Sequence, residues 1–288
     1  MRAAATPREV VEALEDTPGR PDSQRERFRG YGVMGLPFES GHVLGLRRFP
    51  VSSIGPASTS IWHRSPDGRW SFWSTAAPEV SCARYAGEVS DDTHQTAVRL
   101  AWPEPYRLTI AADDPGLSWE VTFAATPTSR ALSALAQRLP GPFLARENVL
   151  RVLGPVAGTL LGAGPLALTG RMPNRQIFHL VPSHVWPVTA SRAYLEAADL
   201  GRPAPLPEQA TIGDFRIPQH GLLAVGALDF DPLRPRTALD PHGPQLNSRP
   251  CWQAGPDGSG GESATGRSLP VALAPLLSLG SAGRRTPV

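Results

Sequence analysis

SIWHRSPDGRWSFWST, residues 60–75, is the stretch that decides the fold. Its centre, Ser65-Pro66-Asp67-Gly68, predicts a turn, because proline presets φ at the second position and glycine accepts a positive φ at the fourth. A type I turn followed by a left-handed residue commonly closes a β-hairpin. The stretch therefore predicts two antiparallel strands, which carry three tryptophans between them.

Pairing Ser65 with Arg69 divides the hairpin side chains between two faces. One face carries Trp62, Arg64, Trp70 and Phe72, and the other carries Ile61, His63 and Trp73. Both faces are largely apolar, whereas a strand pair with one wet side alternates apolar and polar residues. We therefore expect both faces to be covered, and we expect Arg64 to lie over the Trp70 ring. A two-residue Asp-Gly loop would regroup the side chains and stays open as an alternative.

The composition favours strands and loops over long helices. The chain has 288 residues with 32 Pro and 28 Gly, and charged residues make up 19%. All 28 basic residues are arginines, the net charge is +2, and the arginines form no concentrated run. Nucleic-acid binding needs a concentrated basic face, so we expect no nucleic-acid partner.

Cysteine usage and the N-terminal stretch indicate a cytoplasmic protein. Cys82 and Cys251 are too few for a disulfide framework or a cysteine metal cluster. The first twenty residues contain acidic groups and no apolar core of signal-peptide length. His63, His179 and His184 show no close metal-ligand spacing. We expect no metal and no cofactor.

Three regions follow from the pattern of breakers and apolar residues. Residues 1–27 are a leader with a short helix from Pro7 to about Asp16, started by the capping box Thr6-Pro7-Arg8-Glu9, and we expect it to dock loosely. Residues 28–231 are a β-rich ligand-binding domain. Residues 232–288 are rich in Pro, Gly, Ser and Arg and predict a disordered tail.

Within the β-rich domain, alternation and turn residues predict a series of strands. They are Val80–Val89, Ala97–Trp102, Tyr106–Ala112, Leu117–Ala125, Leu166–Gly170, Gln176–Pro182, Trp186–Ala190 and Leu222–Phe230. A helical insertion over residues 127–162 interrupts them, with one helix over Pro127–Leu139 and another from about Ala145 to Leu161. The loop-rich segment 195–219 is long enough to suggest a functional role.

Residues 149–168, VLRVLGPVAGTLLGAGPLAL, are apolar over nearly the length of a membrane span. Gly154, Gly158 and Gly162 repeat every fourth residue, a spacing that lets helices pack closely in lipid. Pro155 and Pro165 argue against a spanning helix. We favour a buried helix packed on the sheet, with membrane contact as the alternative.

Residues Phe28–Phe230 resemble a family of uncharacterised bacterial proteins that share segments like GYGVMGLPFESGHVLGLRRFP, WHRSPDGRWSFWS and PLPEQATIGDFRIPQHGLLAVG. More distantly, the two aromatic strands and their Asp-Gly turn are similar to the lipocalin-like hydroxyneurosporene synthase (carotenoid hydratase) and cyclase group. The resemblance implies a barrel pocket for a long apolar substrate but carries over no catalytic motif. The fold class expected is mainly β, a lipocalin-like barrel or curved antiparallel sandwich with an inserted helix pair.

Three residues are candidates for acid–base catalysis. His63 shares a face with Trp73 and could act as a general acid or base in an aromatic pocket, although a hydrogen-bonded histidine at the surface of the sheet is the simpler explanation. Glu120 lies next to Trp119, and solvent exposure is its simpler explanation. Asp214 could orient His220 as a base, but a proline separates them. No Ser in a GxSxG elbow and no activating neighbour of Cys82 is found.

Aromatic and polar residues of the strands are the candidates for ligand binding. They are Trp62, Trp70, Phe72, Trp73, Arg84, Tyr85, Trp119 and His179. The leading hypothesis is binding of a small hydrophobic, lipid- or terpenoid-like molecule, with cofactor-free hydration, isomerisation or cyclisation as the chemistry. The alternatives are a non-catalytic carrier or sensor of apolar ligands, and a membrane-surface protein that uses residues Val149–Leu168. Whether the protein is an enzyme and its oligomeric state stay open.

Overall fold

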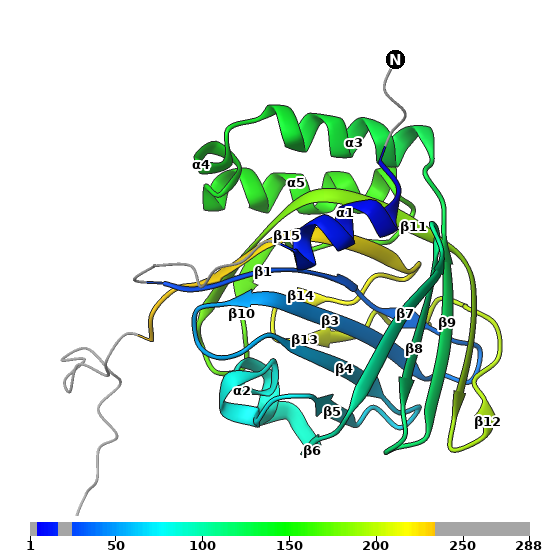
Figure 1. Cartoon of the computed structure of the whole chain (residues 1–288). Helices are drawn as coiled ribbons and strands as arrows, with labels where there is room; N and C mark the ends of the chain where they lie inside the picture. The colour runs from blue at the N-terminus through cyan, green and yellow to red at the C-terminus, as the bar shows by residue number, and fades with distance from the viewer. Residues whose placement is uncertain (1–4, 17–24, 234–288) are drawn as a thin grey trace, which may run out of the picture. The chain divides into compact units, whose positions relative to one another are not determined.

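The computed structural model describes residues 5–16 and 25–233 (Figure 1). Strands dominate this part of the chain and helices interrupt them, so the expected mainly β class with inserted helices is confirmed. The predicted tail over residues 232–288 lies outside the described residues from Arg234 onward, and Cys251 falls there too.

One large sheet organises the described residues. Its main path runs β6-β5-β4-β3-β1-β15-β11-β9-β8-β7. Of these neighbours, β5 and β6 pair in parallel and the others pair antiparallel. The bounds are β1 Glu26–Val33, β3 Val43–Ser52, β4 Ser58–Arg64, β5 Trp70–Ser74, β6 Ser90–Gln95, β7 Val98–Glu104, β8 Arg107–Ala112, β9 Leu117–Phe123, β11 Ile177–Leu195 and β15 Leu222–Phe230.

Short strands complete the β structure. β2 (Leu36–Pro37) pairs with β3, while β10 (Thr169–Arg171) and β12 (Ala198–Asp199) pair with β11. β13 (Thr211–Ile212) and β14 (Phe215–Arg216) form a separate two-stranded sheet within the loop-rich segment. Two predicted strands, Gln176–Pro182 and Trp186–Ala190, are one long strand, β11, whose register against β15 shifts between Pro182 and His184.

The central hairpin has the predicted register. Trp62 pairs with Phe72 and Arg64 with Trp70. The turn closes through the Ser65 N–H, which donates to the Arg69 carbonyl at 2.9 Å, and Gly68 has φ +94°. Both faces are covered: one belongs to a cluster with Trp62, Trp70 and Phe72, and the other to a cluster with Ile61 and Trp73.

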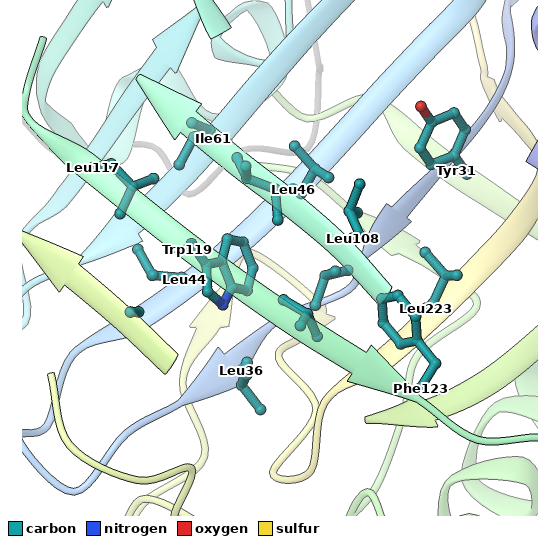
Figure 2. Close-up of a cluster of buried hydrophobic side chains, with 14 of the residues drawn as sticks. Tyr31, Leu36, Leu44, Leu46, Ile61, Leu108, Leu117, Trp119, Phe123 and Leu223 are labelled. Carbon is teal, nitrogen blue, oxygen red and sulfur yellow. The ribbon is translucent and has the colours of Figure 1, made fainter. Parts of the chain in front are cut away.

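The sheet curls so that strands far apart in its order pack face to face. Leu44, Leu46 and Ile61 of β3 and β4 share one buried cluster with Leu108 and Trp119 of β8 and β9. Figure 2 shows these side chains meeting between the crossed strands. On this concave side, where a lipocalin-like pocket would lie, buried apolar side chains form one cluster. The opposite, convex face carries a second buried cluster, whose residues form much of the lining of a cavity beside Trp62.

The N-terminal helix α1 (Pro7–Glu15) starts with the predicted capping box. Its docking differs from the prediction of a loose leader, because Val11 is only 1% exposed within the concave cluster. Glu15 also accepts two hydrogen bonds from the Arg48 guanidinium, at 2.8 and 2.9 Å. The amphipathic pattern of the helix therefore has a partner surface on the sheet.

The strand predicted over Val80–Val89 is wrong. This segment forms the 3₁₀ turn η1 (Pro78–Val80), helix α2 (Ala83–Ala86) and the 3₁₀ turn η2 (Gly87–Val89). The buried positions explain the error, because Cys82, Ala83, Tyr85 and Ala86 follow helical spacing, whereas a strand buries alternate residues. Arg84 and Tyr85 therefore project from a helix that covers the sheet.

The insertion contains three helices, α3 (Pro127–Arg138), the short α4 (Gly141–Leu144) and α5 (Glu147–Leu160), which Figure 1 shows grouped on one side of the sheet. Two glycines of the repeat let α5 pack closely against the segment that follows it in the same chain. A Cβ on Gly154 would lie 2.6 Å from the Leu166 carbonyl oxygen, and one on Gly158 would lie 2.1 Å from that of Gly164. No helix of the described residues is both long and apolar enough to cross a membrane.

Candidate functional site

A cavity of about 60 Å³ lies against Trp62 on the convex face of the sheet. We call it the aromatic chamber. Strands β1, β3, β4, β11 and β15 form its floor, and Tyr85 of α2 and Phe215 of β14 close it from the other side. Its aromatic lining residues are Phe28, Tyr31, Phe49, Trp62, Tyr85, Phe178, Phe215 and Phe230.

Arg47 of β3 also lines the aromatic chamber, and its side chain is 5% exposed. The guanidinium donates hydrogen bonds to three backbone carbonyls, those of Val33 at 2.7 Å, Leu46 at 2.8 Å and Met34 at 3.0 Å. It lies 4.2 Å from the ring centroid of Trp62 and 5.4 Å from that of Phe215. Arg47, and not the expected Arg64, is therefore the cation over an indole of the hairpin.

The charge of Arg47 has no carboxylate partner among the described residues. Burial lowers the pKa of Arg47 to about 10, so the guanidinium stays protonated at neutral pH. A buried cation is costly unless it is compensated, and carbonyl dipoles with two aromatic rings compensate only part of a full charge. The arrangement leaves a positive potential at the wall of the chamber.

A second donor lies beside Arg47. The Trp62 indole N–H is buried and has no hydrogen-bond partner among the described residues, while the Cys82 thiol lies next to both groups. Burial raises the pKa of Cys82, although Arg47 opposes this, so the thiol is neutral and a poor acceptor. Arg47 and Trp62 thus give the chamber a cation and a second N–H donor, with no anionic acceptor among the described residues.

Three polar residues surround Glu26 at the edge of the chamber. Its carboxylate accepts hydrogen bonds from Arg84 at 2.6 Å, from the Tyr85 hydroxyl at 2.5 Å and from Gln176 at 3.2 Å. Burial acts to raise the pKa of Glu26, but these bonds outweigh it and keep the pKa below its ordinary value. Burial, and then Glu26, raise the pKa of Tyr85, so its hydroxyl stays protonated.

A larger cavity of about 130 Å³ lies between helices α3 and α5 and strand β11. We call it the helix groove. It adjoins the aromatic chamber, because five residues line both cavities: Met34, Leu180, Pro182, Phe215 and Ala224. Its other walls are mostly Leu, Val and Ala of the helices, such as Leu135, Leu150 and Val156.

His184 is a titratable residue of the helix groove that the sequence analysis did not assign to catalysis. Burial lowers its pKa, and its ring stacks on Trp186 with centroids 5.5 Å apart. The Ser183 hydroxyl donates to the Val225 carbonyl at 3.0 Å and lies 3.1 Å from Nδ1 of His184. Because that hydroxyl has one proton, it accepts from Nδ1–H, which leaves Nε2 with the free lone pair.

Of the residues predicted to bind a ligand, Trp62 and Tyr85 line the aromatic chamber. Phe72 packs edge-on against the Trp62 indole, and Trp70 stacks on Phe72. Phe72 therefore contacts the Trp62 indole directly, and Trp70 supports Phe72. Arg84 reaches the chamber edge through Glu26.

The other three predicted binding residues lie elsewhere. Trp73 and Trp119 belong to the concave cluster, where the Trp119 indole donates to Ser191 at 2.9 Å. His179 is buried beside Thr169, and its Nε2 lies 3.5 Å from the carboxylate of Asp231.

The three predicted catalytic residues lie apart from one another. His63 stacks between His42 and Trp73, with centroids 5.1 Å from each, and burial lowers its pKa to about 4. Glu120 is exposed and lies 3.8 Å from Arg107.

Asp214 is also exposed, and it accepts a hydrogen bond from the Arg171 N–H at 2.7 Å. His220 contacts the Gly162 carbonyl instead of pairing with Asp214.

Sequence reasoning missed Arg47, although a signal was present. In β3, Arg47 alternates with Val43, Phe49 and Val51, a row that is otherwise apolar or glycine. An arginine in such a row is rare unless it is paired or functional. Phe215 was missed because it belongs to the loop-rich segment, whose packing no periodicity predicts.

No protein-family model matches the chain, and no curated protein matches it. Among solved structures, an acetoacetate decarboxylase from Legionella pneumophila subsp. pneumophila str. Philadelphia 1 aligns with a TM-score of 0.32 and 10% identity, over 80% of this chain and 94% of that chain. A likeness at this level carries no argument about function.

Proposed function

We propose that the protein binds a small molecule with an apolar body and a negatively charged head group, such as a carboxylate. The observation that carries the proposal is the buried Arg47 guanidinium at the wall of the aromatic chamber, without a carboxylate partner in the described part of the chain. The unpartnered Trp62 indole N–H supports it, because both groups are donors. An anionic head group would satisfy the two together.

The size and lining of the two cavities fit the rest of such a molecule. At roughly 10–15 Å³ per water-sized group, the aromatic chamber of about 60 Å³ holds about four to six heavy atoms. The adjoining helix groove of about 130 Å³ offers room for an apolar tail among leucines and valines. These dimensions favour a medium-chain ligand over the long polyene that the carotenoid-hydratase resemblance implies.

Binding without chemistry is favoured by the protonation of the chamber residues. Burial keeps both Cys82 and Tyr85 protonated, so neither supplies a base at neutral pH. A carrier or sensor needs only affinity, which the donors and the apolar walls provide. The cytoplasmic location and the resemblance to the lipocalin-like group stay predictions.

Proton transfer on the bound ligand is the second candidate, and His184 is the observation that favours it. His184 is a lining residue of the groove, and its unprotonated Nε2 can accept a proton from an activated carbon, as an isomerase requires. In D₂O, a β,γ-unsaturated octenoate should then gain deuterium with the wild-type protein and not with His184→Gln. Absence of exchange with the wild-type protein would remove this candidate.

The binding proposal is tested by comparing octanoate with octanol in isothermal titration calorimetry. A charge-assisted hydrogen bond contributes about 1.5–3 kcal/mol, so octanoate should bind roughly ten- to a hundredfold more tightly than octanol. Arg47→Met should remove this preference, Arg47→Lys should retain part of it, and Arg192→Met, which changes an exposed arginine of β11, should leave it intact.

The wild-type comparison decides the question even if Arg47→Met fails to fold, which circular dichroism checks. Equal affinity for octanoate and octanol, or no binding of either, would contradict the proposal. Native mass spectrometry of protein purified from its own host gives an independent test, since a retained acidic amphiphile is expected.

A further inference from the structure

Exposed apolar side chains gather on the inserted helices. Among the described residues, seven large hydrophobic side chains are exposed, and five belong to α3, α4 and α5. We call this set the helix face: Leu135, Phe143, Val152, Val156 and Leu160. Val152 is 64% exposed and Leu160 is 55% exposed, so water contacts much of their surface. A concentration of this kind marks an interaction surface.

The exposed residues of the helix face are distinct from the residues by which α5 packs on the rest of the protein. In α5, Leu150, Gly154 and Gly158 form the buried stripe that packs on the rest of the chain. Val152, Val156 and Leu160 recur every fourth residue and form a separate stripe that faces solvent. The helix therefore has two apolar sides, and the fold uses one of them.

The charges of the segment that carries the helix face are mostly positive. Residues 127–161 contain four arginines and one acidic residue, Glu147. Arg130, Arg138, Arg146 and Arg151 are all exposed, and Glu147 is paired with Arg151. The chain as a whole is nearly neutral, with a net charge of +2, so this segment concentrates positive charge beside exposed apolar residues.

We infer that the helix face binds the surface of a membrane that contains anionic lipids. Valine, leucine and phenylalanine side chains would enter the boundary between head groups and acyl chains, while the arginines would contact lipid phosphates. The helices lie on the surface in this arrangement, in keeping with the finding that no described helix is long and apolar enough to cross. Leu135 and Val156 belong both to the helix face and to the lining of the helix groove.

Flotation with liposomes tests the inference on the full chain. Wild-type protein should float with vesicles of phosphatidylglycerol and phosphatidylcholine and remain in solution with phosphatidylcholine alone. The double change Val152→Glu and Val156→Glu should reduce bound protein at least tenfold. Val89→Glu is the matched control, because Val89 is also an exposed valine, at 41%, but lies in η2, and it should bind like the wild type.

Charge is tested separately. Arg138→Gln with Arg146→Gln should weaken binding roughly thirtyfold, since each arginine near an anionic surface contributes about a fivefold factor. Arg192→Gln should have no effect.

Two results would overturn the inference. One is equal flotation of the wild type and the Val152/Val156 variant. The other is a wild-type protein that does not float with the anionic vesicles. If light scattering then shows a dimer that the Val152/Val156 variant dissociates, the face is a contact between copies. Arg47→Met should still float, so failure of ligand binding and failure of membrane binding are distinguishable.

Discussion

His63 of the central hairpin is a buried side chain whose protonation makes the stability of the fold depend on pH. Its ring lies between those of His42 and Trp73, and its Nε2 is 2.8 Å from Nδ1 of His42. Burial lowers the pKa of His63 from 6.5 to about 4, and His42 contributes in the same direction. The stacked group is therefore a structural element that tolerates only the neutral imidazole.

The pH dependence of stability follows from this shift. Between pH 6.5 and pH 4 the unfolded chain binds a proton at His63 and the folded chain does not. The contribution of neutral His63 to the free energy of unfolding is thus fully present above pH 6.5 and decreases as the pH falls. At pH 5 the free energy of unfolding is lower by about 2 kcal/mol. Urea denaturation at pH 7 and pH 5 should show this loss. His63→Phe should reduce it, leaving the smaller effect of His42, and an unchanged loss in that variant would contradict the assignment.

At the scale of elements, α1 is part of the core. Val11→Ala should lower the free energy of unfolding by about 1–3 kcal/mol, because it removes buried methyl groups from the concave cluster. Glu12→Ala, at an exposed position of the same helix, should change it by less than about 0.5 kcal/mol. Chemical denaturation measures both. An unchanged free energy of unfolding in Val11→Ala would instead support the loosely docked leader that the sequence predicted.

The packing of α5 depends on the absence of a side chain at Gly158. Gly158→Ala places a methyl group 2.1 Å from the Gly164 carbonyl oxygen, so the helix must move away from the segment that follows it. We expect a loss of about 1–3 kcal/mol in thermal or urea unfolding. Gly141→Ala is the control, since a Cβ there meets no atom within 4 Å. Equal stability of the two variants would show that the contact is not tight.

The elements that the sequence predicted are those with a strong local signal. The Pro-Asp-Gly turn set the hairpin register, and the alternation in Leu117–Phe123 placed β9 correctly. Val80–Val89 was misassigned because its apolar residues fit two periods over a short length. The cavity walls depend on Arg47 and Phe215, which are far apart in sequence, and no local pattern brings such residues together.

At the scale of the whole molecule, the sheet order predicts which strands unfold locally most often and expose their backbone amides to exchange. β1, β15 and β11 have neighbours on both sides, whereas β6 and β7 end the main path. Hydrogen exchange should therefore be slowest in residues 26–33 and 222–230 and fastest in residues 90–95 and 98–104. Mass spectrometry of deuterated peptides measures this order. Faster exchange in β15 than in β6 would contradict the sheet described here.

The pairing of β1 with β15 also constrains how a ribosome can make this protein. β1 emerges early, and its partner over Leu222–Phe230 is the final strand of the sheet. Until that strand leaves the exit tunnel, β1 lacks the neighbour that joins the early strands to the later strands of the sheet. The apolar surfaces of the early strands stay exposed to water during that time. Exposed apolar surface of this kind makes a nascent chain prone to aggregate. A slow stretch of translation before β15 has left the exit tunnel would prolong that exposure, and the same delay after it has left would not.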